Sequence, residues 1–202
     1  MSAFLGPIHY WLYNKIKIQN TITDDILKLG KEEYNLDFRE YLDKEYGKLD
    51  PAPLEEQIDE SNIHGWLQER VDVVENRLAY LVTNLLKEKP QSLEKMKEIY
   101  KETGAKLSKV NEKSTVSEIY KEAVHDSLLD GMPCDRVNSV DAQDEDLVIW
   151  KRNQCVHEEF WDKFGGDVKN YYLLRDEFIT GFLQASNATY EKIDEYTFKI
   201  SR

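Results

Sequence analysis

The chain has 202 residues, of which 41% are hydrophobic, and its 39 acidic and 27 basic side chains give a formal net charge of −12. This length and apolar content suffice for one hydrophobic core, so we expect a single domain over residues 1–202. A subdivision into a helical bundle, 1–133, and an α+β tail, 134–202, is the alternative. So large an excess of acidic residues argues against nucleic acid and anionic membranes as partners, because both are polyanions.

Several features indicate a cytoplasmic protein. No segment approaches the roughly 20 apolar residues that span a bilayer. Residues 1–7 contain no basic residue, and Gly6-Pro7 interrupts their short apolar run, so we expect neither a signal peptide nor an anchor. The two cysteines, Cys134 and Cys155, are too few for a disulfide framework and suit a reducing compartment.

The first half of the chain is predicted to be helical. Pro7 begins a helical pattern of apolar residues that continues to about residue 34, with a restart or bend at residues 21–24. Residues 35–53 are rich in Tyr, Asp and Lys and contain Gly and Pro, so we expect a long connection there. Residues 53–88 carry the strongest helical pattern in the chain.

Two shorter helices are predicted next. Residues 91–103 form a helix rich in Lys and Glu that Gly104 should end. Thr115 and Glu118 have the spacing of a capping box, so a further helix should run from there to Leu129.

The last third of the chain changes character. Residues 137–150 predict a hairpin around an acidic turn, although this turn could instead cap a helix. Helices are expected over about 154–164 and 168–186, and residues 196–200 alternate with a period of two, as in a strand. The predicted fold class is therefore mainly α, a helical bundle, with a small C-terminal antiparallel β element.

The four histidines share one local pattern. Each follows a β-branched aliphatic residue, and the third residue after each is Leu or Phe, so the pattern places every imidazole on the apolar face of a predicted helix. The four segments are Ile8-His9-Tyr-Trp11-Leu12, Ile63-His64-Gly-Trp66-Leu67, Val124-His125-Asp-Ser-Leu128 and Val156-His157-Glu-Glu-Phe160. The first two agree further, since Lys15 and Arg70 follow at the same spacing, which indicates a weak duplication or two helices that meet one core.

The leading hypothesis is a metal- or small-ligand-binding domain whose internal pocket is lined by these four histidines. Imidazoles bind zinc or iron, and two of them could hold haem axially. Glu60 precedes His64 and Glu122 precedes His125 by about one helical turn, so both glutamates are candidate ligands. Only the second pair has the Glu-x-x-His form of di-iron proteins, which disfavours a ferritin-like site. Buried histidines with hydrogen-bond partners and no metal are the alternative.

Arg175 and three tryptophans are candidate ligand-binding residues. Arg175 lies among aromatic and aliphatic residues, where its guanidinium either pairs with an internal carboxylate or clamps a ligand carboxylate or phosphate. Trp11, Trp66 and Trp161 either line the same pocket or pack in the core.

Cys155 is the candidate nucleophile. His157 could supply a base, although residues two apart on a helix point in different directions. A cysteine-dependent small-molecule hydrolase is therefore the second hypothesis, with an inert buried thiol as the alternative. A structural or protein-interaction bundle without a bound ligand is the third.

Residues 137–200 resemble a known group of proteins. Their order is a hairpin, Cys155 at the start of a helix, Phe160-Trp-Asp-Lys-Phe-Gly165, a second helix and a final strand with Tyr196, Phe198 and Ile200. This order is similar to the C-terminal part of the aminothiazoline-carboxylate hydrolase and vinyl-reductase-like small-molecule-binding families. The resemblance implies an α+β tail and a small organic ligand, although those families carry further cysteines near the end and the final strand here has none. We therefore expect a small molecule or a metal ion as partner, and a homo-oligomer is compatible with the sequence.

Overall fold

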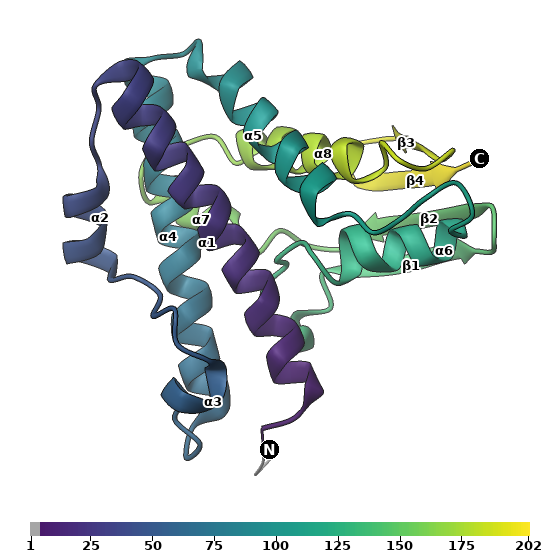
Figure 1. Ribbon diagram of the computed structural model, residues 1–202, viewed down its shortest axis with the longest axis horizontal. Coiled ribbons are helices and arrows are strands. Elements are labelled where there is room, and N and C mark those ends of the chain that lie inside the picture. Colours follow the sequence, from purple (N-terminus) through teal and green to yellow (C-terminus); the bar gives the residue numbers. More distant parts are fainter. Residues whose placement is uncertain (1–4) are drawn as a thin grey trace.

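The computed structural model describes residues 5–202 and confirms the predicted fold class, a mainly helical protein with a small antiparallel sheet (Figure 1). Residues 1–4, the first part of the segment expected to be neither a signal peptide nor an anchor, lie outside the described part of the chain. The helices are α1 (Pro7–Tyr34), α2 (Arg39–Tyr46), α3 (Leu54–Gln57), α4 (Ile63–Glu88), α5 (Ser92–Leu107), α6 (Val116–Tyr120), α7 (Glu158–Asp162) and α8 (Lys169–Phe182). The remaining elements are a π-helical turn, η1 (Lys121–His125), a 3₁₀ turn, η2 (Pro133–Asp135), and the strands β1 (Asn138–Gln143), β2 (Leu147–Arg152), β3 (Thr189–Lys192) and β4 (Thr197–Ser201). Within residues 5–202, no helix is long and apolar enough to cross a membrane.

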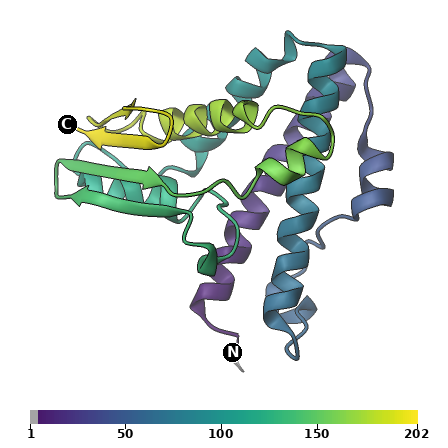
Figure 2. The same cartoon turned by 180° about the vertical axis from the view of Figure 1, so that it is seen from behind.

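The two longest helices, α1 and α4, lie side by side and run in the same direction (Figures 1 and 2). His9 and His64 meet near the first turns of the two helices, and Gln19 contacts Glu75 further along. The described α1 continues through residues 21–24, so the expected bend is wrong. The hydroxyls of the threonines in this segment donate to the backbone carbonyls one turn earlier, which keeps them within the helix.

The single helix predicted over residues 53–88 is two helices, α3 and α4, separated by a turn. Asp59 accepts hydrogen bonds from the backbone N–H and the hydroxyl of Ser61, and this local bonding competes with helical bonding. Asn62 then caps α4 by accepting from the N–H of Gly65. The connection expected over residues 35–53 also differs, because it contains α2.

Gly104 does not end a helix, contrary to expectation, but lies inside α5 where this helix contacts α8. A Cβ atom at Gly104 would overlap the backbone of Phe178, and a Cβ atom at Gly181 would overlap the carbonyl of Lys101. Glycines on facing helices therefore let the backbones of α5 and α8 approach each other closely.

The C-terminal part forms a four-stranded antiparallel sheet in the order β1-β2-β4-β3. The β1–β2 hairpin and β4 agree with the prediction, whereas β3 lies in a segment for which the sequence predicts no strand. Trp150 of β2 pairs with Phe198 of β4. Tyr120 contacts Trp150 with ring centroids 5.0 Å apart, so α6 covers this face of the sheet.

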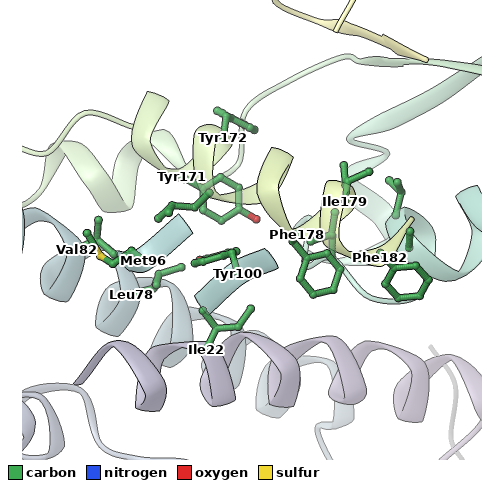
Figure 3. Packing of buried hydrophobic residues seen from close by; sticks show 14 of the residues in the cluster. Ile22, Leu78, Val82, Met96, Tyr100, Tyr171, Tyr172, Phe178, Ile179 and Phe182 are labelled. Carbon is green, nitrogen blue, oxygen red and sulfur yellow. The ribbon is translucent and has the colours of Figure 1, made fainter. Parts of the chain in front are cut away.

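The larger of two hydrophobic clusters joins the helices to the sheet. Buried side chains from α1, α4, α5 and α8 meet between these helices, as Figure 3 shows for Ile22, Leu78, Met96 and Phe178. The same cluster continues through Trp150 to the sheet. Its members come from both sides of residue 133, the boundary considered for a subdivision.

Replacement of Gly181 by alanine should destabilise the fold. The added methyl group would overlap the Lys101 carbonyl, so α5 and α8 would have to separate, and overpacking of this kind costs about 1–3 kcal/mol. Chemical denaturation followed by circular dichroism measures the loss. Thr180→Ala, at the exposed neighbouring position, is the control and should change the free energy of unfolding by less than about 0.5 kcal/mol. Equal stability of Gly181→Ala and the wild type would contradict the close approach of the two backbones.

Candidate functional site

A pocket of about 860 Å³ lies between the N-terminal half of α1, the α6–η1 segment and the segment that leads into β1. Its apolar lining consists of Trp11, Tyr120, Val124, Met132, Pro133, Val137 and Val140. Its charged lining consists of Lys15, Glu118, Lys121, His125, Asp130 and Arg136. Of these charged side chains, those of Lys15 and Asp130 are almost entirely buried, and the others are largely exposed. The pocket therefore combines an apolar wall with two buried charged groups.

Lys15 brings a primary amine to the wall of this pocket. The residue is 4% exposed, and its Nζ lies 4.1 Å from the centre of the Trp11 ring. The two carboxylates whose charges act on Lys15 are bonded to other groups, Asp126 to Lys121 and Asp130 to Arg175. Among residues 5–202, no side chain forms a hydrogen bond or an ion pair with this Nζ. The amine can therefore find a polar partner only in the pocket.

Asp130 connects the pocket to a buried chain of ion pairs. The guanidinium of Arg175 in α8 donates to both carboxylate oxygens of Asp130, with 3.1 Å between Nη2 and Oδ2. His157 lies between two carboxylates, with Nε2 3.7 Å from Oδ1 of Asp130 and Nδ1 3.0 Å from Oε2 of Glu75. Gln19 donates to Oε1 of Glu75 at 2.9 Å. This chain of ion pairs links α1, α4, α8 and the two segments that flank the β1–β2 hairpin. Of the two roles considered for Arg175, the structure shows the pairing with an internal carboxylate.

The protonation states in this chain follow from burial and from opposite charges. Burial would raise the pKa of Asp130, but Arg175 and His157 hold it far below its usual range. Burial would lower the pKa of His157, but the carboxylates of Glu75 and Asp130 raise it to about 9. His157 is therefore an imidazolium at neutral pH and is not available as a base.

The charges of the buried ion pairs balance without Lys15. The carboxylates of Glu75 and Asp130 face the cations of His157 and Arg175, one pair against one pair. Burial lowers the pKa of Lys15 to about 8, although the charge of Asp130 acts in the opposite direction. At neutral pH Lys15 is still mostly protonated, so it adds a buried positive charge that this chain does not compensate.

The four histidines do not converge. His9 and His157 are buried as predicted, but His64 and His125 are exposed, so the prediction that all four imidazoles face inward is wrong for these two. They fall into separate places: one pair at the start of α1 and α4, one ring in the buried chain of ion pairs, and one beside the pocket.

His125 is exposed because the helix that carries it changes its winding. Thr115 and Glu118 form the predicted capping box, but the α-helix ends at Tyr120 and continues as the π-helical turn η1, well before Leu129. A π-helical turn holds more residues than an α-helical one and so rotates the following side chains away from their predicted face. His125 packs on Trp11 instead, with ring centroids 4.9 Å apart.

His9 and His64 do meet, with ring centroids 5.8 Å apart, but in an arrangement that does not suit a metal. Nδ1 of His9 accepts a hydrogen bond from the backbone N–H of Gly6 at 2.8 Å, so the neutral ring carries its proton on Nε2 and has no lone pair there to offer. Within residues 5–202, no group of three or more His, Cys, Asp or Glu side chains could hold a metal ion. Glu60 is exposed and Glu122 is half-buried. The zinc, iron and haem predictions therefore find no support in the described residues.

Cys155 is not paired with His157. The hydroxyl of Tyr172 donates to its Sγ at 3.1 Å, whereas the imidazole is engaged by Glu75. A second pocket, of about 550 Å³, borders Cys155, and its charged lining is entirely acidic: Asp72, Glu75, Asp135, Glu158, Glu159 and Asp162. The hydrolase hypothesis therefore finds no support in this geometry, and Cys155 also precedes α7 rather than opening it.

Of the three candidate tryptophans, Trp11 alone lines the larger pocket. Trp161 is buried in the main core, and Trp66 packs at the side of α4 beneath Arg70. Arg70 lies 4.6 Å from the Trp66 ring centre, and Lys15 lies 4.1 Å from that of Trp11. The repeated sequence pattern in α1 and α4 thus produces the same cation–π contact twice.

Two residues of the site, Glu75 and Lys15, were not predicted, although the sequence contains a signal for both. Glu75 follows Val74 within the apolar stripe of α4, and Lys15 adjoins Ile16 on that of α1. Charged residues at such positions are rarely buried without a partner or a function, so they indicate a site. Asp130 lies outside any helix or strand, where no periodicity marks burial.

His157 should make the stability of the protein depend on pH. Its pKa is about 9 in the folded protein and near 6.5 in an unfolded chain, so the folded state binds the proton more tightly. This contribution is fully present below about pH 6.5 and is lost as pH rises through 9, with a decline of roughly 1.5 kcal/mol between pH 6.5 and 8. Urea unfolding across this interval measures the decline, and His157→Gln should remove most of it. A wild-type free energy of unfolding that stays constant or rises would contradict the buried imidazolium.

Comparison of the chain with protein-family models, with curated proteins and with solved structures finds no match. The resemblance of residues 137–200 to the aminothiazoline-carboxylate hydrolase and vinyl-reductase-like families therefore stays a prediction.

Proposed function

We propose that the chain is a small-molecule-binding domain that takes an apolar or aromatic anion, such as a carboxylate, into the pocket beside Lys15. The observation that carries this proposal is the Lys15 amine, which is buried, faces the pocket and has no polar partner among residues 5–202. A ligand of this kind would bring the missing negative charge.

The size and lining of the pocket support a small organic ligand. Its volume of about 860 Å³ lies within the range of roughly 300–1,000 Å³ that is common for such sites. Trp11, Tyr120 and Val137 offer an apolar surface to the body of the ligand, and Lys15 offers one charged group to its head. Apolar side chains that hold the body of a ligand, together with polar groups that orient it, are the usual composition of a small-molecule site.

The charges near the pocket support an anion. Arg175 donates hydrogen bonds to both carboxylate oxygens of Asp130, so this guanidinium has a structural role and is not available to bind a ligand. Lys15 is left as the buried cation that a ligand could neutralise. An ion pair formed there would be stronger than one in water, because the pocket wall has a lower effective dielectric constant.

Calorimetric titration with 2-naphthoate tests the proposal. Wild-type protein should bind it saturably at pH 7, and Lys15→Met, which keeps the length of the side chain and removes its charge, should lower the affinity at least about tenfold. Lys17→Met, at an exposed position of the same helix, is the matched control and should bind like the wild type. The neutral amide 2-naphthamide should bind more weakly than the acid.

Affinity for 2-naphthoate should also fall as pH rises through about 8, because Lys15 then loses its proton. Two results would overturn the proposal: no saturable binding to the wild type, or equal affinities of Lys15→Met and Lys17→Met. Either result would favour a structural or protein-interaction bundle.

A further inference from the structure

We infer that Lys15 is also a covalent binding site, whose amine forms a reversible imine with an aldehyde or ketone that enters the pocket. This inference rests on the proposed function, because it uses the same pocket and assigns it a carbonyl ligand in addition to an anion.

The geometry leaves the Lys15 amine free to react. Its Nζ lies over the Trp11 ring and carries no hydrogen bond or ion pair to any of residues 5–202, so its lone pair is not engaged once the proton is lost. The side chain is held at 4% exposure on the buried side of α1, which fixes the position of the amine. Tyr120 and Val137 provide apolar surface for the rest of a carbonyl compound.

The reaction needs no oxidant, reductant or further co-reactant. The neutral Nζ attacks the carbonyl carbon, an N–C bond forms, and the electron pair of the C=O π bond moves to oxygen. A proton passes from nitrogen to this oxygen through pocket water, which gives a carbinolamine. The hydroxyl group then leaves with a second proton as water, and a C=N bond remains. Hydrolysis reverses these steps.

Several charged groups surround the amine and set its proton affinity. They are Asp126 and Asp130 after η1, Arg175 on α8, Lys121 and His125 on η1, Glu118 on α6 and Arg136 before β1. Burial is the largest effect and lowers the pKa of Lys15 to about 8, while the two aspartates oppose it. At pH 8 about half of Lys15 is therefore neutral, against less than about 1% of an ordinary exposed lysine.

Reductive trapping tests the inference on the wild-type chain. Benzaldehyde is added at pH 8 with sodium cyanoborohydride, which transfers hydride to the imine and leaves a stable benzyl amine. Peptide mapping by mass spectrometry then gives the extent of modification at each lysine. Lys15 should react at least about tenfold faster than the mean of the exposed lysines, because its neutral fraction at pH 8 is larger by more than this factor. 2-Naphthoate should protect Lys15 alone.

The variants and the pH profile complete the test. Lys15→Met should lose the fast modification, and Lys17→Met should keep it; the fast rate should rise between pH 7 and 9. Modification spread evenly over the exposed lysines would overturn the inference. If 2-naphthoate still bound in that case, the proposed anion site would remain supported. Fast trapping at Lys15 without 2-naphthoate binding would support the inference and refute the anion site. Absence of both would refute both.

Discussion

The bidentate ion pair between Asp130 and Arg175 is the contact on which the rest of the site depends. Arg175 lies on α8, deep in the molecule, and Asp130 lies in the segment between η1 and β1. A buried guanidinium without a carboxylate is strongly destabilising, of order 3–5 kcal/mol, so this segment is held against α8. The same segment continues into Met132 and Val137, which line the pocket. The ion pair therefore positions one wall of the pocket.

His157 and Glu75 extend this constraint to the long helices. Glu75 brings a carboxylate from α4, Gln19 fixes it from α1, and the imidazolium between the two carboxylates joins this group to Asp130. Each charged group in this buried chain of ion pairs has a neighbour of opposite charge, which is the condition under which buried ions are tolerated. Lys15 lies beside this group as a further cation with only the pocket before it. Burial lowers the pKa of this amine, and no side chain of residues 5–202 forms a hydrogen bond with it.

Much of the fold can be predicted from local sequence, and less of the site. Helical periodicity locates the main helices, the Thr115 capping box locates the start of the short helix α6, and alternation locates β4, because these signals are local. The division between α3 and α4 depends on hydrogen bonds of Asp59, and the role of Gly104 depends on a helix some seventy positions later in the chain. The shared pattern of the histidines predicts burial of all four, which is correct for His9 and His157 and wrong for His64 and His125. It cannot predict whether the four meet, since a pattern within one helix carries no information on how helices pack. Arg175 is identified correctly as a buried cation, while its partner Asp130 shows no periodic signal.

Nuclear magnetic resonance titration of the lysine ¹³Cε signals is the most direct test of the claim that Lys15 is an uncompensated buried amine. The Lys15 signal, assigned by its absence from Lys15→Met, should titrate near pH 8, roughly 2 pH units below the reference value of a lysine side chain in water. In Asp130→Asn its pKa should fall further, because the carboxylate that favours the protonated form is gone. A Lys15 signal that titrates above about pH 10 with the exposed lysines would contradict the claim, since the amine would then be solvated or paired.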